Sequence, residues 1–154
     1  IITMKTLDLA RPGAGALAVG LAQSALDEAA AFAKERHQFG APIFSFQAVQ
    51  HLLADIATNV EAARALVYSV ARHIDSKPKD YSKEGAMAKL FATDMAMKAT
   101  VDAVQVMGGH GYMREYPVEK MMRDAKILQI YEGTNQIMRN VIGLALNKEY
   151  SKKK

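Results

Sequence analysis

The sequence predicts an all-α protein, an up-and-down bundle of four or five helices joined by short loops. Long segments are rich in Ala, Leu, Met, Glu and Lys, which are good helix formers. Two of these segments repeat apolar residues in alternating steps of three and four, as long helices packed at small angles do. The prolines predict the breaks between helices; they are Pro12, Pro42, Pro78 and Pro117. The 154 residues suffice for one domain with a core.

The first helix is predicted to begin after Pro12 and to end near Gln38. Its middle is rich in alanine, and such small residues let a neighbouring helix approach closely. The segment 39–42 contains Gly40 and Pro42, which do not continue a helix. We therefore expect the chain to turn there.

The second and third helices are predicted over about Ser45 to Asp75 and about Ser82 to Met107. The apolar seam of the second comprises Val49, Leu53, Ile56, Val60, Ala63, Val67, Val70 and Ile74. The seam of the third, apolar except at Asp94, comprises Met87, Leu90, Asp94, Met97, Val101, Val104 and Gly108. Methionines on this face are expected to fill the core.

Beyond the third helix, segment 108–112 is rich in glycine and predicts a flexible loop. Pro117 is expected to open a short helix that ends near Leu128, because proline suits the first helical turn. A second break follows at 131–134. Thr134 is the predicted N-cap of a last helix from Asn135 to about Lys148.

Composition excludes several classes of protein. The chain has no cysteine, so it holds no disulfide or thiolate chemistry. Charges interrupt every apolar stretch, which argues against a membrane span. The net charge of +4 comes partly from the tail lysines, without the basic stripe and interleaved aromatics of a nucleic-acid surface. We expect a solvated tail, although a basic surface also attracts anions such as a phosphate-bearing coenzyme. The start lacks methionine, which predicts a piece of a longer chain.

Three loops concentrate unusual residues, and each has two interpretations. Arg36 in segment 36–40 is either a phosphate-gripping cation or a surface arginine at a helix end. The glycines of segment 108–111 either let a ligand approach closely or simply stop a helix; they match no dinucleotide or phosphate-loop fingerprint. Glu132 is either a solvated loop carboxylate or a base, because a carboxylate in apolar surroundings binds protons more strongly.

Two other chemistries of helical proteins are not supported. Di-iron bundles use Glu-x-x-His pairs, and no histidine here has a glutamate three residues before it. There is no nucleophile-elbow signature for Ser-His-Asp hydrolysis.

Taken in order, the motifs of the chain resemble the C-terminal domain of acyl-CoA dehydrogenases over nearly its whole length. The matching segments are LDLARP (7–12), ERHQFG (35–40), FQ (46–47), QVMGGHGY (105–112), YPVEK (116–120), RDAK (123–126) and IYEGT (130–134). The resemblance implies an up-and-down four-helix bundle with a short extra helix, and it implies FAD and an acyl-CoA thioester as ligands.

The resemblance also implies residue roles. Glu132 matches the catalytic base that takes the α-proton while the β-hydrogen leaves as hydride to the flavin, giving a trans-2-enoyl-CoA. The matched cofactor-binding residues are Arg36, Phe39, Gln47, Gln105, Gly108, Gly109, Thr134 and Gln136, the first three toward the FAD of a neighbouring subunit. The matched substrate-binding residues are Asp8, Arg11 and Gly133.

The family normally carries an N-terminal helical domain and a middle β-domain, so we expect this single domain alone to turn over little substrate. A glutamate in this loop points to short- or medium-chain acyl groups, a property shared with glutaryl-CoA and short-branched-chain members. The expected partners are an electron-transfer flavoprotein and three further copies in a homotetramer (a dimer of dimers). The expected compartment is the bacterial cytoplasm, or the mitochondrial matrix of a eukaryote. The alternatives are a non-catalytic assembly module and an acyl-CoA oxidase-like relative.

Overall fold

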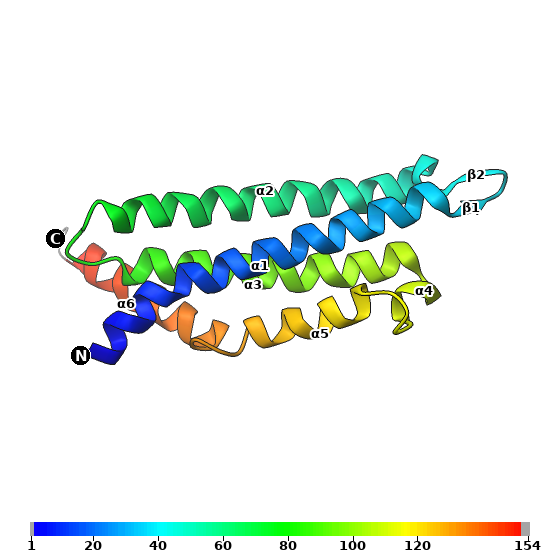
Figure 1. The fold of residues 1–154 in the computed structure, drawn as a ribbon. Helices are drawn as coiled ribbons and strands as arrows, with labels where there is room; N and C mark the ends of the chain where they lie inside the picture. Colours follow the sequence, from blue (N-terminus) through cyan, green and yellow to red (C-terminus); the bar gives the residue numbers. More distant parts are fainter. Residues whose placement is uncertain (1, 152–154) are drawn as a thin grey trace.

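The computed structural model describes residues 2–151 and the side chains of residues 5–151. Three long helices run side by side, namely α1 (Ile2–Glu35), α2 (Gln47–Asp75) and α3 (Ser82–Met107) (Figure 1). The shorter α5 (Val118–Leu128) and α6 (Asn135–Ser151) follow one another along α3 and contact it. The all-α bundle predicted from the sequence is confirmed, with one additional helical turn, α4 (Gly109–Tyr112).

The connection from α1 to α2 is a small hairpin that the sequence analysis did not anticipate. Strands β1 (His37–Gln38) and β2 (Ala41–Pro42) pair antiparallel, and a 3-10 turn, η1 (Ile43–Ser45), leads into α2. The two residues between the strands both have positive φ, 53° at Phe39 and 78° at Gly40, as tight hairpin turns require. The prediction that α1 reaches Gln38 was wrong, because β1 pairing replaces helical hydrogen bonds there.

The prediction that the first helix begins after Pro12 was also wrong. Proline 12 lies inside α1, where it cannot donate the helical hydrogen bond to the Asp8 carbonyl. Pro12 is buried, and Gly85 of α3 lies so close that an added Cβ would stand 3.1 Å from that carbonyl oxygen. Packing of α1 against α3 offsets the missing bond, so the helix continues through the proline.

The core lies between α1, α2 and α3, and α3 is its central element. The seam predicted for α2 is confirmed, since its middle residues are buried: Leu53, Ile56, Val60, Ala63, Val67 and Val70. The seam predicted for α3 is not the buried face, because its members are half-buried or exposed, with Val101 at 44%. Helix α3 contacts α1, α2, α5 and α6. It therefore buries a broad face of mainly small residues, including Ala86, Ala88, Ala92, Ala96, Ala99 and Ala103.

The C-terminal third follows the predicted order with one correction. Gly108, at φ 59°, ends α3, and the residues expected to form a loop instead make the helical turn α4. Pro117 stands at the N-cap of α5, as predicted. The Thr134 hydroxyl accepts a hydrogen bond from the Ile137 amide at 3.3 Å, which confirms the cap of α6. That helix ends three residues beyond the predicted Lys148. The tail lysines at 152–154 lie outside the described residues.

Within residues 2–151, no helix has the length and apolar character needed to cross a bilayer.

Candidate active site

The loop between α5 and α6 has an unusual backbone. Glu132 has φ 55° and Gly133 has φ 93°, both in the left-handed region. A non-glycine residue is uncommon there and stores conformational strain. An added Cβ at Gly133 would stand 2.8 Å from Cε of Met138, so the position is also short of space. The amide of Asn135 donates to the Gln129 carbonyl at 3.0 Å and closes the loop.

The carboxylate of Glu132 is partly enclosed. The residue is half-buried, and its Oε2 is buried without a hydrogen-bond partner among the described residues. A buried polar atom without a partner is costly, and in native structures such atoms call for a functional explanation. An enclosed carboxylate with a free oxygen can accept a proton from a bound molecule. The solvated-carboxylate interpretation left open by the sequence does not fit this geometry.

Beneath the loop lies a fully buried lysine. Lys89 of α3 is 0% exposed, and its Nζ donates to the Gly133 carbonyl at 2.9 Å and to Oδ1 of Asn135 at 2.7 Å. The pKa of Lys89 is lowered to about 8, mainly by burial; the charge of Arg11 acts in the same direction, while Asp94 and Glu132 act in the opposite one. Lys89 was not among the residues predicted from the sequence, because a lysine in a helix usually faces solvent.

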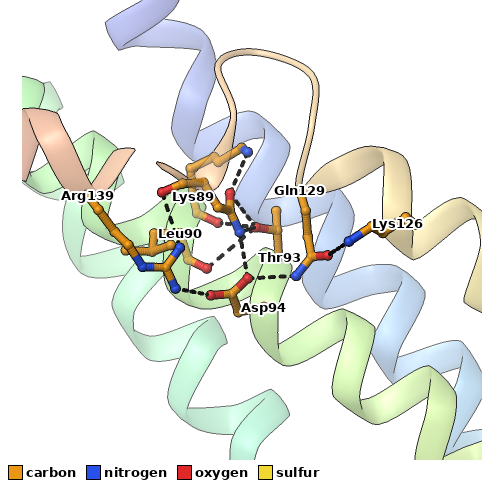
Figure 2. A network of polar contacts seen from close by, with 8 residues as sticks. Lys89, Leu90, Thr93, Asp94, Lys126, Gln129 and Arg139 are labelled. Carbon is orange, nitrogen blue, oxygen red and sulfur yellow. Dashed lines mark hydrogen bonds and ion pairs between the residues drawn. The ribbon is translucent and has the colours of Figure 1, made fainter. Parts of the chain in front are cut away.

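Asp94 extends the polar network outward (Figure 2). Its Oδ1 accepts hydrogen bonds at 2.7 Å from the side-chain amides of both Gln129 and Asn135. Its Oδ2 pairs with the Arg139 guanidinium at 2.8 Å. The only available signal in the sequence was the interruption of an apolar seam by Asp94. The network joins α3 to the ends of α5 and α6, on either side of Glu132.

Asp8 and Arg11, the predicted substrate-binding residues of α1, form an ion pair with each other. Arg11 is only 2% exposed, and its Nε is buried with no hydrogen-bond partner among the side chains and backbone that the structure describes. The hydroxyl of Ser82 donates to Asp8 at 2.6 Å. The charge of Arg11 contributes to lowering the pKa of Lys89, so Arg11 lies near the lysine beneath the loop. Their contact with a coenzyme A moiety stays a prediction.

The predicted cofactor-binding residues fall into two groups. Thr134 and Gln136 adjoin Glu132 in the chain. The others lie at or next to the helix ends that meet near the β1–β2 hairpin, away from the α5–α6 loop (Figure 1). They are Arg36, Phe39, Gln47, Gln105, Gly108 and Gly109. A contact between the rings of Phe32 and His110, 5.3 Å apart, ties α4 to the end of α1 there. One copy of the chain therefore does not bring both groups together.

The hairpin end fits a flavin nucleotide in its chemistry. Arg36 and Gln105 are exposed and offer a cation and an amide to phosphates. Phe39 is 95% exposed, an uncommon state for a large apolar ring. A Cβ added at Gly108 or Gly109 would meet nothing within 4 Å, so their backbone is open to an approaching group. Among the described side chains, no cluster of His, Asp and Glu is suited to hold a metal ion.

The helical bundle and the enclosed loop carboxylate agree with a known family. A family model described as acyl-CoA dehydrogenase, C-terminal domain, matches residues 1–146. The chain belongs to the acyl-CoA dehydrogenase family, whose members are generally FAD-dependent.

Similar proteins are known in bacteria. The chain is 56% identical over 143 residues to the probable acyl-CoA dehydrogenase FadE25 of Mycobacterium tuberculosis, covering 93% of this chain and 37% of that protein. Butyryl-CoA dehydrogenase from Megasphaera elsdenii matches in structure with a TM-score of 0.91 at 48% identity, over 94% of this chain and 38% of that one.

A third match comes from a structure of the electron-transferring flavoprotein of Acidaminococcus fermentans, which concerns the mechanism of flavin-based electron bifurcation. One of its chains matches with a TM-score of 0.90 at 54% identity, over 94% of this chain and 38% of that chain. The chain thus spans little more than a third of the length of these relatives.

Proposed function

We propose that this chain is the C-terminal helical domain of a longer FAD-dependent dehydrogenase that converts a short- or medium-chain acyl-CoA into its trans-2-enoyl-CoA. The membership in the family supports the reaction class. The similarity to butyryl-CoA dehydrogenase supports a short acyl chain. The 37% share of FadE25 that the chain covers supports the presence of further domains in the whole enzyme.

The observation that carries the proposal is the buried, unpartnered Oε2 of Glu132. In the proposed reaction this oxygen accepts the proton from the carbon next to the thioester carbonyl. The left-handed backbone at Glu132 and Gly133 sets the direction in which the Glu132 side chain leaves the loop. A base that is already positioned lowers the entropic cost of reaching the reactive geometry.

Arg36, Phe39, Gln47, Gln105, Gly108 and Gly109 would hold FAD at the hairpin end, and Thr134 and Gln136 would hold it beside the base. When bound, FAD supplies the acceptor for the hydride from the β-carbon. Because the two groups of residues lie apart on one chain, each FAD would contact two copies. This division supports association of copies, as in the homotetramer (a dimer of dimers) that the family resemblance implies.

The electron acceptor of the whole enzyme is proposed to be an electron-transfer flavoprotein. The match to a chain from the Acidaminococcus fermentans structure supports that partner. The bacterial sources of the relatives support a cytoplasmic enzyme.

Replacement of Glu132 by glutamine in the full-length, FAD-loaded protein tests the function. The amide keeps the size of the side chain but cannot accept the proton, so anaerobic butyryl-CoA should no longer bleach the flavin absorbance. The FAD content should be unchanged. Glu61→Gln, at an exposed glutamate of α2, is the matched control and should bleach at the normal rate. Bleaching by the Glu132 variant at the normal rate would exclude Glu132 as the base.

A second role, in assembly, is favoured by exposed apolar side chains. Leu17 of α1 and Leu144 of α6 are 62% and 72% exposed in the single chain. Such side chains gain from burial against another copy. We expect the isolated chain to associate in sedimentation experiments while giving little or no turnover with an artificial electron acceptor. A monomeric chain would contradict the assembly role, and substantial turnover would contradict the need for further domains.

A further inference from the structure

We propose that Lys89 is the positioning residue of the proton-abstracting loop, which it holds through the Gly133 carbonyl. The inference rests on the proposed function, because it concerns the loop that carries Glu132. Lys89 lies 44 residues before Gly133 in the chain, on the central helix α3, and its Nζ donates to that carbonyl at 2.9 Å. The bond therefore anchors a strained loop to the most enclosed helix of the bundle.

A second hydrogen bond makes the anchor two-sided. The same Nζ donates to Oδ1 of Asn135 at 2.7 Å, in the first turn of α6. Lys89 thus bridges the residues before and after Thr134. Its side chain is completely buried, so the ammonium group has little room to move. The carbonyl directly after Glu132 is consequently fixed relative to α3.

The charge of Lys89 contributes as well as its hydrogen bonds. The groups that act on it electrostatically are Arg11 of α1, Asp94 of α3 and Glu132 of the loop, and Arg139 of α6 offsets Asp94 from the outer side. A charged donor makes a stronger hydrogen bond to a carbonyl than a neutral amine does. The pKa of Lys89 is lowered to about 8, mainly by burial. Above that pH the lysine loses its charge, so its hydrogen bond to the Gly133 carbonyl weakens.

The test compares Lys89→Met with Thr100→Val in the full-length, FAD-loaded protein. Methionine keeps a long apolar side chain and removes the buried charge together with its desolvation cost. Thr100 is equally buried on the same helix, but its hydroxyl donates within α3, to the carbonyls of Ala96 and Met97. Lys89→Met should slow flavin bleaching by butyryl-CoA about ten- to a hundredfold, the effect of losing one hydrogen bond to a charged group. KM should change little, and Thr100→Val should bleach within about threefold of the normal rate.

Amide hydrogen exchange of residues 130–136 separates this inference from the proposed function. Exchange in this segment should accelerate at least tenfold in Lys89→Met and stay nearly normal in Thr100→Val. This readout needs no turnover, so it holds even where Glu132→Gln leaves activity intact and the proposed function fails. Unchanged loop exchange in Lys89→Met, or equal effects of the two variants, would overturn the positioning role.

Lys89→Arg provides a second variant should the methionine variant not fold. It retains the charge and the donors, and it should restore slow loop exchange and the greater part of the bleaching rate. Lys89→Gln, which lacks the charge, is the comparison for this variant. Equally fast loop exchange in Lys89→Arg and Lys89→Gln would also overturn the inference.

Discussion

The buried lysine makes the stability of this domain depend on pH in an unusual direction. Lys89 has its pKa lowered to about 8 in the folded chain, from an ordinary value of 10.5. Below pH 8 the lysine is protonated in both the folded and the unfolded state, and folding carries the full cost of burying the charge. Between pH 8 and 10.5 the unfolded state still binds the proton that the folded state has lost. Unfolding then takes up protons, and stability rises with pH.

The magnitude follows from the displacement of the pKa. At about 1.4 kcal/mol per pH unit, the displacement corresponds to an upper limit of about 3 kcal/mol. Lys89→Met removes this titration. Between pH 7 and 10, the unfolding free energy of the unaltered chain should therefore rise relative to that of Lys89→Met, by up to about 3 kcal/mol.

Urea unfolding of the isolated chain, followed by far-UV circular dichroism at pH 7, 8, 9 and 10, measures this shift. Lys98→Met is the matched control on the same helix. Lys98 is exposed, and its hydrogen bond to Asp102 raises its pKa, so its contribution is lost only above its ordinary value. The control should run parallel to the unaltered chain between pH 7 and 10. A difference between the unaltered chain and Lys89→Met that stays constant over this range would refute the reasoning.

Further predictions concern packing and a buried ion pair. Gly111→Ala should lower stability by about 1–3 kcal/mol, because its Cβ would stand 2.9 Å from the Val104 carbonyl oxygen. Gly143 lies on the exposed face of α6, where an added Cβ would meet no atom within 4 Å. Gly143→Ala should therefore raise the stability by about 0.5–1 kcal/mol. Thermal unfolding checks both, and equal shifts would contradict the packing argument. Asp8→Asn should lower stability by about 3 kcal/mol, because it leaves the charge of Arg11 buried without its partner. An unchanged urea midpoint would contradict that role.

The strain at the α5–α6 loop and the buried network below it belong together. A left-handed glutamate persists only where its surroundings over-determine the backbone. Here the constraints come from the Gly133 carbonyl bond to Lys89, the Asn135 amide bond to Gln129 and the capped start of α6. A loop held in this way can present one carboxylate oxygen without an internal partner.

Features set by neighbouring residues in the chain were predictable. The helical segments, the proline at the start of α5 and the threonine cap of α6 depend on local propensity and hydrogen bonds within one turn. The seam of α2 was readable because that helix packs on one side only. The motif around Glu132 marks it as the proposed base, because its residue types and order resemble those of the family.

Other features depend on contacts between distant residues, and only the tertiary structure decided them. Pro12 interrupts a helix by local rules, but packing against Gly85 keeps α1 continuous. The buried face of α3 is broad because helices from the rest of the chain pack against it on several sides, which its own periodicity does not reveal. Lys89 has the local sequence of a surface lysine, and only the partners brought by α1 and the α5–α6 segment make it buried. Burial and hydrogen-bond partners are properties of the assembled bundle, whereas helix formation is largely a property of the segment.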